Sequence, residues 1–434
     1  MNAPAGGRRF ALVLEPVAIA LLLAAIASQW GHVADWRFDL ARFQVLGLIA
    51  FAAYALAVAC RTRWRALPRA GAFVVVVAIV LRVAVLPVTP TLSDDVYRYA
   101  WEGRVMASGQ SPYAHAPDDP ALAGLRDHEV HPRVNHPALR AIYPPLAELG
   151  FALVARVSYT PLAFKLWVIL HDLALVALLA WWCASRGGSA WDALVYAWNP
   201  LVVSEYAGNA HHDPTGVVWL VAALAWAERR PLASAAAALG SVMVKLVALP
   251  AWPFIARAWP RRVQLAGALV LLGALAGYLF LARGPDSGLE AYASSWRHND
   301  ALFGLLARVV GETSARPVGL AVVVALGVAL FVRRVAATDA VRALLRVGLL
   351  LGPVVQPWYL GWVLAFECLS PSWAWLVLSC TVTLGYGTFA PPADGGAYHP
   401  SALVRGVEFG IPAVIAAGIA IARRVRRNRV RDAA

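Results

Sequence analysis

The stretch SDDVYRYAWEGR, residues 93–104, follows directly after the apolar run 71–88. Two adjacent carboxylates therefore stand where a membrane helix would leave the bilayer. If the stretch is helical, three pairs of polar side chains lie one turn apart: Asp94 with Arg98, Asp95 with Tyr99, and Arg98 with Glu102. This pattern predicts a ridge of charged and hydroxyl groups at the membrane boundary.

The composition places most of the chain in a membrane. Of 434 residues, 60% are hydrophobic and only 15% are charged, and the mean hydropathy is +0.62. Soluble domains carry about 25% charged residues. The chain is therefore predicted to be an all-α, polytopic membrane protein with about 12–14 transmembrane helices and an interfacial helical loop on its outer face.

Apolar runs of about 20 residues mark the expected transmembrane helices. The clearest runs are 10–30, 42–60, 70–88, 160–184, 191–208, 261–281, 316–333 and 405–422. Short or proline-interrupted runs lie at 214–228, 231–258, 340–370 and 373–390. The first run is expected to be a retained signal anchor, because no cleavage site followed by a polar segment is evident.

Arginine sets the predicted orientation. The net charge is +13, and the arginines cluster at the ends of apolar runs, as they do in cytoplasmic loops of membrane proteins. Nucleic acid is therefore not an expected partner. Both termini are predicted to be cytoplasmic, in a multi-pass protein of the cell membrane, and the loop 89–159 extracytoplasmic. Within that loop, residues 142–158 are expected to form a helix lying on the outer leaflet.

Three further polar segments fall on the same predicted face. They are residues 208–213 (GNAHHD), 294–300 (SSWRHND) and 355–359 (VQPWY). Scattered structural polar groups would not be expected to gather on one side, so the four segments predict a single site. The candidate site residues are Asp94, Asp95, Tyr97, Arg98, His211, His212, Asp213, Lys245, Arg297, His298, Gln356, Trp358 and Tyr359.

The two aspartates are the candidate catalytic residues. A carboxylate in an outer cleft can take the proton of an acceptor hydroxyl, and general base catalysis contributes about 10²–10⁴-fold. Asp94 is placed ahead of Asp95, because Arg98 one turn later would hold it ionised and oriented. The alternative role is capping of a helix N-terminus beside Ser93, and one aspartate could serve each role.

The other charged candidates suit a phosphate and a sugar. Lys245 lies within an apolar segment, where an ionisable group is a functional candidate. Its alternative is snorkelling to a headgroup, which is the expected behaviour of Lys165. Arg297 and His298 beside Trp296 combine a cation with an aromatic face, although Arg297 could equally be an idle loop charge.

His211, His212 and Asp213 are expected to bind phosphate or sugar hydroxyls, and a structural role stays open. Metal ligation is less suited to them, because adjacent histidines point in different directions and no third ligand has a diagnostic spacing. The four cysteines show no CxxC spacing, so neither a disulfide framework nor a zinc site is expected. No cofactor is predicted, and a dependence on a divalent metal ion stays open.

Several of these motifs resemble those of a known enzyme family. The first outer loop resembles that of the C-type (GT-C) integral membrane glycosyltransferases, at residues 93–99, Gly103, Gly109, Ser111-Pro112-Tyr113 and Tyr143-Pro144-Pro145-Leu146. It looks most like the bacterial alpha-mannosyltransferase branch that uses polyprenyl-phosphate sugars. Later motifs of that branch resemble Asn199-Pro200-Leu201, residues 208–213 with His212 in place of the usual Asn, Lys245 with Pro250, and Pro357-Trp358-Tyr359-Leu360.

The resemblance implies a multi-helix fold in which an acidic residue of the first outer loop, here Asp94 or Asp95, is the catalytic base. It also implies a lipid-phosphate-linked sugar as donor, attack by an acceptor hydroxyl, and inversion at the anomeric carbon. The predicted orientation agrees, because an extracytoplasmic enzyme cannot draw on a cytoplasmic nucleotide sugar. Cations such as Arg98, Arg297 and Lys245 would stabilise the leaving phosphate.

The sequence therefore predicts a membrane glycosyltransferase that moves a sugar, with mannose preferred, from a polyprenyl-phosphate donor to an extracytoplasmic glycan or glycolipid. One alternative is the same chemistry with arabinose or glucose. Another is a lipid-linked sugar flippase in which Asp94 and Lys245 would be coupling charges. A flippase should carry polar groups along a path through the bilayer, whereas here they gather on one face, which favours the enzyme.

Three parts of the chain are expected. Residues 1–69 form a two-helix membrane extension, residues 70–370 the catalytic core, and residues 371–434 the last membrane helices with a basic cytoplasmic tail. The acceptor, the linkage position, the oligomeric state and the choice between the two aspartates stay open at this level.

Overall fold

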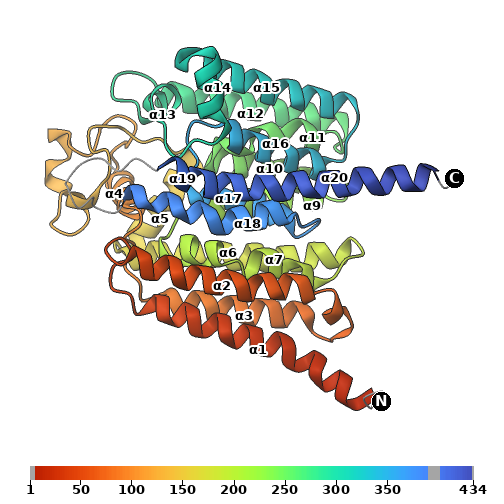
Figure 1. Cartoon of the computed structure of the whole chain (residues 1–434). Coiled ribbons are helices and arrows are strands. Elements are labelled where there is room, and N and C mark those ends of the chain that lie inside the picture. The colour runs from red at the N-terminus through yellow and green to blue at the C-terminus, as the bar shows by residue number, and fades with distance from the viewer. Residues whose placement is uncertain (1–4, 390–400, 433–434) are drawn as a thin grey trace.

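The computed structural model describes residues 5–389 and 401–432, and these residues are predominantly helical. Long helices lie side by side and antiparallel, and α1 begins at the same end of the bundle at which α20 ends (Figure 1). Within the described residues, the only extended pairing is a single bridge between His298 and Val354. The prediction of an all-α polytopic membrane protein is confirmed.

Six described helical spans are long and apolar enough to cross a membrane. Five of them are α1 (Ala5–Gly31), α2 (Leu40–Cys60), α6 (Pro161–Ser185), α12 (Arg261–Leu281) and α15 (Glu312–Val332). The sixth covers residues 403–425 and includes most of α19 (Ala402–Arg405) and the first part of α20 (Ile411–Asp432). These bounds agree with the predicted runs to within a few residues, except at α20.

Shorter helices complete the bundle. They are α3 (Ala70–Val85), α9 (Asp213–Trp226), α10 (Pro231–Val244), α11 (Trp252–Ala256), α13 (Gly288–Ser294), α14 (Leu302–Val310), α16 (Ala337–Leu351), α17 (Leu360–Glu367) and α18 (Trp373–Thr381). Proline explains several of these short lengths, since it lacks the N–H that continues a helix. The predicted run 340–370 is divided in this way into α16, the turn η7 (Pro357–Tyr359) and α17.

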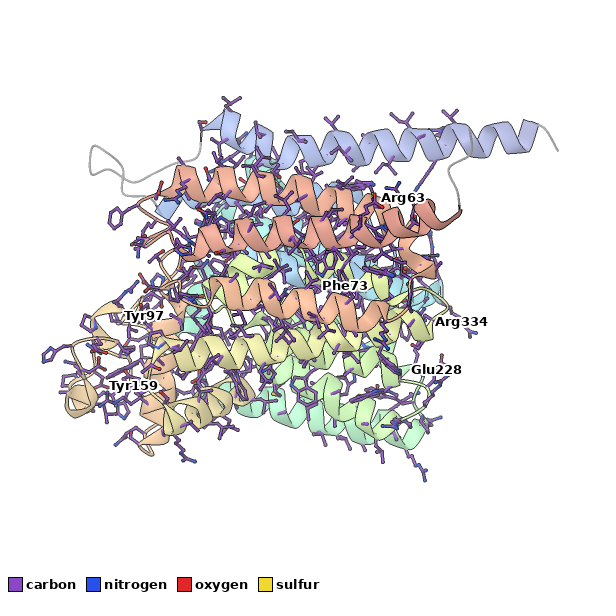
Figure 2. The ribbon with its side chains drawn as sticks, turned by 90° about the horizontal axis from the view of Figure 1, so that it is seen from below. Arg63, Phe73, Tyr97, Tyr159, Glu228 and Arg334 are labelled. Carbon is purple, nitrogen blue, oxygen red and sulfur yellow. The ribbon has the colours of Figure 1, made fainter. Side chains whose placement is uncertain are left out.

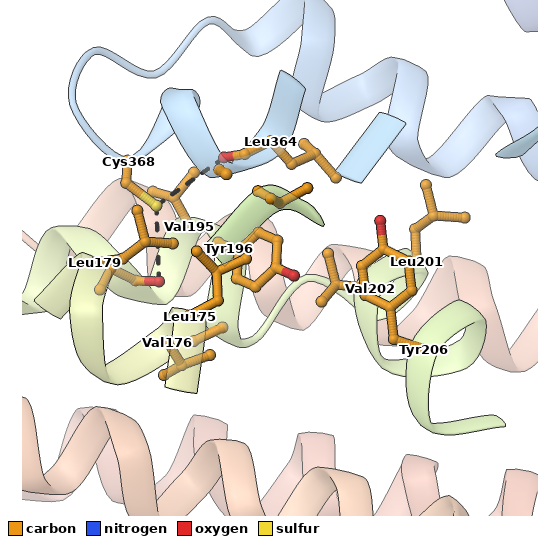
Figure 3. Close-up of a cluster of buried hydrophobic side chains, with 14 of the residues drawn as sticks. Leu175, Val176, Leu179, Val195, Tyr196, Leu201, Val202, Tyr206, Leu364 and Cys368 are labelled. Carbon is orange, nitrogen blue, oxygen red and sulfur yellow. Dashed lines mark hydrogen bonds between the residues drawn. The ribbon is translucent and has the colours of Figure 1, made fainter. Parts of the chain in front are cut away.

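The predicted run 191–208 is broken rather than continuous. It contains the 3-10 turn η4 (Ala190–Ala193), α7 (Leu194–Ala197), α8 (Pro200–Val202) and the π-helical turn η5 (Val203–Gly208). The side chain of Asn199 accepts a hydrogen bond from the N–H of Leu201 at 3.0 Å, which restarts the helix at Pro200. Figure 3 shows the apolar side chains that hold this segment between α6 and α17.

Two outer helices lie at the end of the bundle away from the start of α1 (Figure 1). α4 (Asp95–Ala107) packs closely on α5 (Pro145–Val157) at Gly103. A Cβ atom at this position would lie 2.4 Å from the carbonyl oxygen of Phe151, so the contact requires glycine. One face of α5 exposes apolar side chains at a spacing of three or four residues: Leu146, Leu149, Leu153 and Val157. This pattern agrees with the helix predicted to lie on a membrane surface at 142–158.

The two ends of the bundle carry different side chains. Arg63, Glu228 and Arg334 lie at one end, and Tyr97 and Tyr159 lie at the other (Figure 2). We call these the arginine-rich end and the tyrosine end.

Lys165 does not snorkel, so the expectation for this residue is wrong. Its side chain is 2% exposed, and its ammonium donates to the carbonyl oxygens of Leu86 at 2.8 Å and Val88 at 2.5 Å. These carbonyls follow the end of α3, where backbone acceptors have no partner within the helix. The lysine therefore satisfies a helix C-terminus instead of reaching the headgroups.

Candidate functional site

A cavity of about 750 Å³ opens where α4 and the outer loops meet the bundle. Seven predicted site residues line it: Asp94, Asp95, Arg98, Lys245, Gln356, Trp358 and Tyr359. Trp296 of the predicted segment 294–300 lines it as well. The predicted residues that are not among its lining are Tyr97, His211, His212, Asp213, Arg297 and His298.

The cavity continues from this polar region into an apolar one. Its apolar lining comes from η6 (Leu246–Ala251), α15, α16 and α17, and includes Val247, Leu320, Val323 and Leu344. Val247 is 42% exposed and Leu320 is 65% exposed on the outside of the bundle. The apolar part of the cavity therefore reaches the surface that faces lipid in a membrane protein.

Asp94 stands immediately before α4 and makes no capping bond with its side chain. Its carboxylate accepts a hydrogen bond from Arg133 at 2.7 Å and lies 3.9 Å from Arg37. The predicted pairing of Asp94 with Arg98 is wrong. Because Asp94 precedes the helix, the one-turn spacing does not direct its side chain toward Arg98.

Asp95 begins α4, and its side chain faces the cavity with 20% of its surface exposed. Its carboxylate accepts from the amide of Asn135 at 2.7 Å and from the hydroxyl of Tyr99 at 3.4 Å. The predicted spacing of Asp95 and Tyr99 is confirmed. No arginine or lysine is paired with this carboxylate among the salt bridges of the described residues.

Arg98 pairs with Glu102 at 2.6 Å, as the helical spacing predicts. Its other N–H groups donate to the carbonyl oxygens of Asn135, His136 and Leu139, at 3.0, 2.9 and 2.5 Å. Arg98 therefore anchors the loop that carries Asn135, and few of its donors are left for a phosphate.

Tyr97, which is not among the cavity-lining residues, supports this wall from behind. Its hydroxyl accepts a hydrogen bond from Arg133, whose guanidinium also stacks 3.9 Å from the ring centroid. Burial is the main cause that raises the pKa of Tyr97, so its hydroxyl stays neutral. Tyr97 thus holds the arginine that contacts Asp94.

Tyr143 lines the cavity between α4 and α5. Its ring centroid lies 5.4 Å from that of Tyr99. Burial first, and then the negative charge of Asp95, raise the pKa of Tyr143 well above its ordinary value. The phenol therefore stays protonated beside the carboxylate.

His211 is fully buried behind the cavity wall. Its ring stacks on Trp358 with centroids 3.6 Å apart. Its Nδ1 lies 3.1 Å from a carboxylate oxygen of Glu205, and its Nε2 lies 4.0 Å from Asp95. The side chain is thus one layer behind a candidate catalytic carboxylate.

His212 has a different environment, since aromatic rings surround it. Its ring centroid lies 5.0 Å from Tyr99, 4.6 Å from Tyr143 and 5.3 Å from Phe151. The ring packs the inner side of the α4–α5 pair. This is the structural role that the sequence left open for the segment.

Lys245 and Asp213 form a pair at the cavity. The ammonium donates to Asp213 at 2.6 Å and lies 4.6 Å from the ring centroid of Tyr359. Trp362 donates to the same carboxylate oxygen at 2.6 Å. Since an ammonium has three N–H donors and the Lys245 side chain is 20% exposed, donors remain for a ligand.

The segment 294–300 contributes a ring rather than its cation. Arg297 pairs with Asp300 at 3.0 Å and with Glu312, on the side of α14 and α15. His298 takes part in the backbone bridge to Val354. Trp296, in contrast, lines the cavity and packs against His136, with ring centroids 4.3 Å apart and ring planes tilted by 41°.

The segment 355–359 forms the wall between the cavity and His211. Gln356 lines the cavity, and its buried side-chain oxygen has no hydrogen-bond partner. Trp358 separates His211 from the open space, and the Tyr359 hydroxyl lies 3.3 Å from that of Tyr292.

Sequence reasoning missed four residues of this site: Arg37, Arg133, Asn135 and Glu205. A signal existed for the two arginines, because both lie on loops predicted to be outside, where the positive-inside pattern does not call for them. Asn135 and Glu205 carried no such signal.

Within residues 5–389 and 401–432, no group of three His, Cys, Asp or Glu side chains is placed to hold a metal ion. The expectation about cofactors stays a prediction.

Comparisons with known proteins bear on the chemistry of this site. The family model described as alpha-(1->6)-mannopyranosyltransferase, N-terminal domain, matches residues 14–261, which is more than half of the chain. The match includes α1 from residue 14 onward, all of α2, α4 and η5, and Lys245. No curated protein and no solved structure matched the chain.

Proposed function

The chain belongs to the alpha-(1->6)-mannopyranosyltransferase family, and from this premise we propose that it transfers mannose from a polyprenyl-phosphate donor to an extracytoplasmic glycan or glycolipid. It is a membrane mannosyltransferase. The donor, the acceptor, the side of the membrane and the catalytic residues are the parts that we propose.

The shape of the cavity supports a lipid-linked donor. Its polar part carries both aspartates, and its apolar part runs between η6 and α15 to side chains exposed on the outside of the bundle. A prenyl chain can enter such a groove from the bilayer while its phosphate stays at the polar end. A nucleotide sugar has no apolar tail that would use this groove.

Two cations at the polar end suit the leaving phosphate. Lys245 keeps free donors beside Asp213, and Arg37 lines the cavity with a side chain 29% exposed. Cations held in advance of the reaction stabilise charge that develops on the leaving oxygen. We propose these two in place of Arg98 and Arg297, whose donors are engaged elsewhere.

Asp95 is the base that we propose, ahead of Asp94. Asp94 is paired with Arg133 at 2.7 Å, so one of its carboxylate oxygens is already engaged in an ion pair. Asp95 has an amide and a phenol as partners and opens on the same cavity. The acceptor oxygen attacks the anomeric carbon as its proton moves to Asp95, the bond to the phosphate oxygen breaks, and the configuration inverts.

The outer rim of the cavity suits the acceptor. Trp296 and His136 pack against each other there, and both lie on loops next to the polar end. Aromatic faces bind the apolar side of sugar rings, so this pair is the platform we propose for the acceptor. The tyrosine end then faces away from the cytoplasm and the arginine-rich end faces the cytoplasm, in agreement with the distribution of positive charge.

The single observation that carries this proposal is that the two aspartates and a membrane-facing apolar groove belong to one cavity. The test is transfer of radiolabelled mannose from polyprenyl-phosphate mannose to a glycolipid extract by purified protein in detergent. We expect transfer by the wild type, no transfer from a nucleotide-linked mannose, and loss of transfer in Asp95→Asn.

The matched control is Asp39→Asn, since Asp39 lies outside the cavity on the loop between α1 and α2 and its side chain is 48% exposed. It should transfer mannose like the wild type. Transfer from the nucleotide-linked donor alone would overturn the proposed lipid-linked donor. No transfer from any donor would overturn the proposed enzyme and favour transport.

A further inference from the structure

Glu205 and His211 form a buried pair behind the cavity. Both side chains are 0% exposed, and Nδ1 of His211 lies 3.1 Å from Oε2 of Glu205. Glu205 belongs to the π-helical turn η5, a rare form that is frequent at functional sites. The backbone of Ala210 is left-handed, with φ of 62°, which is strained for a residue with a side chain. This unusual backbone brings His211 back toward Glu205.

The ring of His211 is held in one orientation. It stacks on Trp358 with an angle of 11° between the ring planes. The carbonyl of Trp358 accepts a hydrogen bond from Tyr206 at 2.9 Å, and that hydroxyl fits only because residue 361 is glycine. A side-chain carbon at Gly361 would lie 1.5 Å from the Tyr206 oxygen. Nε2 of His211 is thereby kept facing Asp95 at 4.0 Å.

Three polar atoms of this pair are not satisfied, although Ser204 donates a hydrogen bond to Oε1 of Glu205 at 3.4 Å. Oε2 of Glu205 and both ring nitrogens of His211 are buried without a well-aligned hydrogen bond. Buried polar groups are normally paired, so an exception needs a reason. Nδ1 next to the carboxylate is the nitrogen that carries the proton, which leaves Nε2 as an acceptor directed at Asp95.

We propose that Glu205 and His211 are positioning residues that take over the proton received by Asp95. The inference rests on the proposed function and deepens its mechanism. The acceptor hydroxyl gives its proton to Asp95 while its oxygen bonds to the anomeric carbon, and the electron pair of the broken bond leaves on the phosphate. The proton then moves from Asp95 to Nε2 of His211, and Asp95 is again a carboxylate. Glu205 balances the charge of the imidazolium.

Substrate binding must close the gap between Asp95 and Nε2 by about 1 Å, since catalytic hydrogen bonds are often long without substrate. Other charged or titratable groups also face the three residues. They are Tyr99 of α4, the neighbouring His212 and Asp213, Lys245 after α10, His136 and Tyr143 of the outer loop, Tyr206 of η5, and Tyr386 of η8 (Val382–Phe389).

The experiment measures mannose transfer against pH for the wild type, His211→Gln and Glu205→Gln. In the wild type, protonation of His211 blocks the relay and produces an acid limb in kcat. His211→Gln should lower kcat on the order of 10²-fold, near the lower end of general base effects, and remove this limb. The KM for the donor should stay within about 3-fold, because neither residue lines the cavity.

Glu205→Gln keeps the shape of the side chain and removes its charge, so it is informative even where His211→Gln does not fold. Without the carboxylate, the imidazolium that the relay forms is less stable. The acid limb of Glu205→Gln should therefore move to lower pH. His115→Gln is the matched control, because His115 lies on the outer loop, pairs with Asp119 at 2.7 Å and does not line the cavity.

The outcomes separate the two proposals. A wild type that transfers no mannose sinks the proposed function. If the wild type transfers mannose and Glu205→Gln keeps the wild-type kcat and acid limb, the relay alone is overturned. Removal of the limb by His115→Gln would overturn it too.

Discussion

Asp95 at the tyrosine end has surroundings opposite to those of two carboxylates at the arginine-rich end. At the arginine-rich end, Asp192 is held by Arg61 at 3.0 Å and by Arg65 at 3.3 Å. Glu367 is likewise paired with Arg346 and is fully buried. At the tyrosine end, Asp95 has no such cation and opens on a cavity.

The difference teaches how one residue type serves two purposes. A carboxylate paired with arginine connects helices, whereas one that opens on a cavity and has only neutral donors as partners can meet a substrate hydroxyl. Asp94 lies between these cases, because it is in the cavity but is bonded to Arg133. The following predictions test this comparison.

The largest effect is expected at Asp95. Asp95→Asn should lower kcat by about 10²–10⁴-fold, the contribution of a general base. Asp94→Asn should cost less, since its charge is already shared with Arg133. The measurement is kcat on a lipid-linked donor for protein that elutes as folded in detergent. A larger loss in Asp94→Asn would reverse the assignment of the base.

Removing the arginine partner of a buried carboxylate should lower the free energy of unfolding and leave turnover unchanged. Arg346→Met leaves Glu367 buried without its partner, which costs about 3 kcal/mol in the free energy of unfolding, the lower end for a broken buried pair. Thermal unfolding in detergent measures this loss. The double variant Arg346→Met, Glu367→Gln should recover part of it, and donor KM should not change in either protein.

Lys245 should act on donor binding. Lys245→Met is expected to raise the donor KM by about 10–100-fold, because a hydrogen bond to a charged group contributes about 1.5–3 kcal/mol. The change also leaves Asp213 without its cation. Lys245→Met with Asp213→Asn is therefore the control for folding. If the double variant regains the wild-type KM, the lysine serves structure only.

The smallest effect is expected at Arg297. Its side chain is 36% exposed and pairs with Asp300 and Glu312 away from the cavity. Arg297→Ala should cost less than about 1 kcal/mol of stability, as partly exposed ion pairs do. Donor KM should stay within about 2-fold. A rise of tenfold or more would return this arginine to the phosphate site.

Local patterns in the sequence explain what could be predicted. Apolar runs located the long helices, because hydropathy is a property of neighbouring residues. The helical period also predicted two of the three pairs in the first outer helix, Asp95 with Tyr99 and Arg98 with Glu102. The third pair failed at Asp94, which lies one residue outside the helix.

The sequence by itself determined the helical membrane fold, the mannosyltransferase family and the position of two carboxylates after an apolar helix. The tertiary structure alone decided the partner of each charge. Asp94 meets Arg133, 39 residues away, and Lys245 meets Asp213, 32 residues away. Hydropathy and helical period act over a few residues, whereas charge pairing depends on how distant segments pack. The pairing of Glu205 with His211 likewise depends on the folded chain.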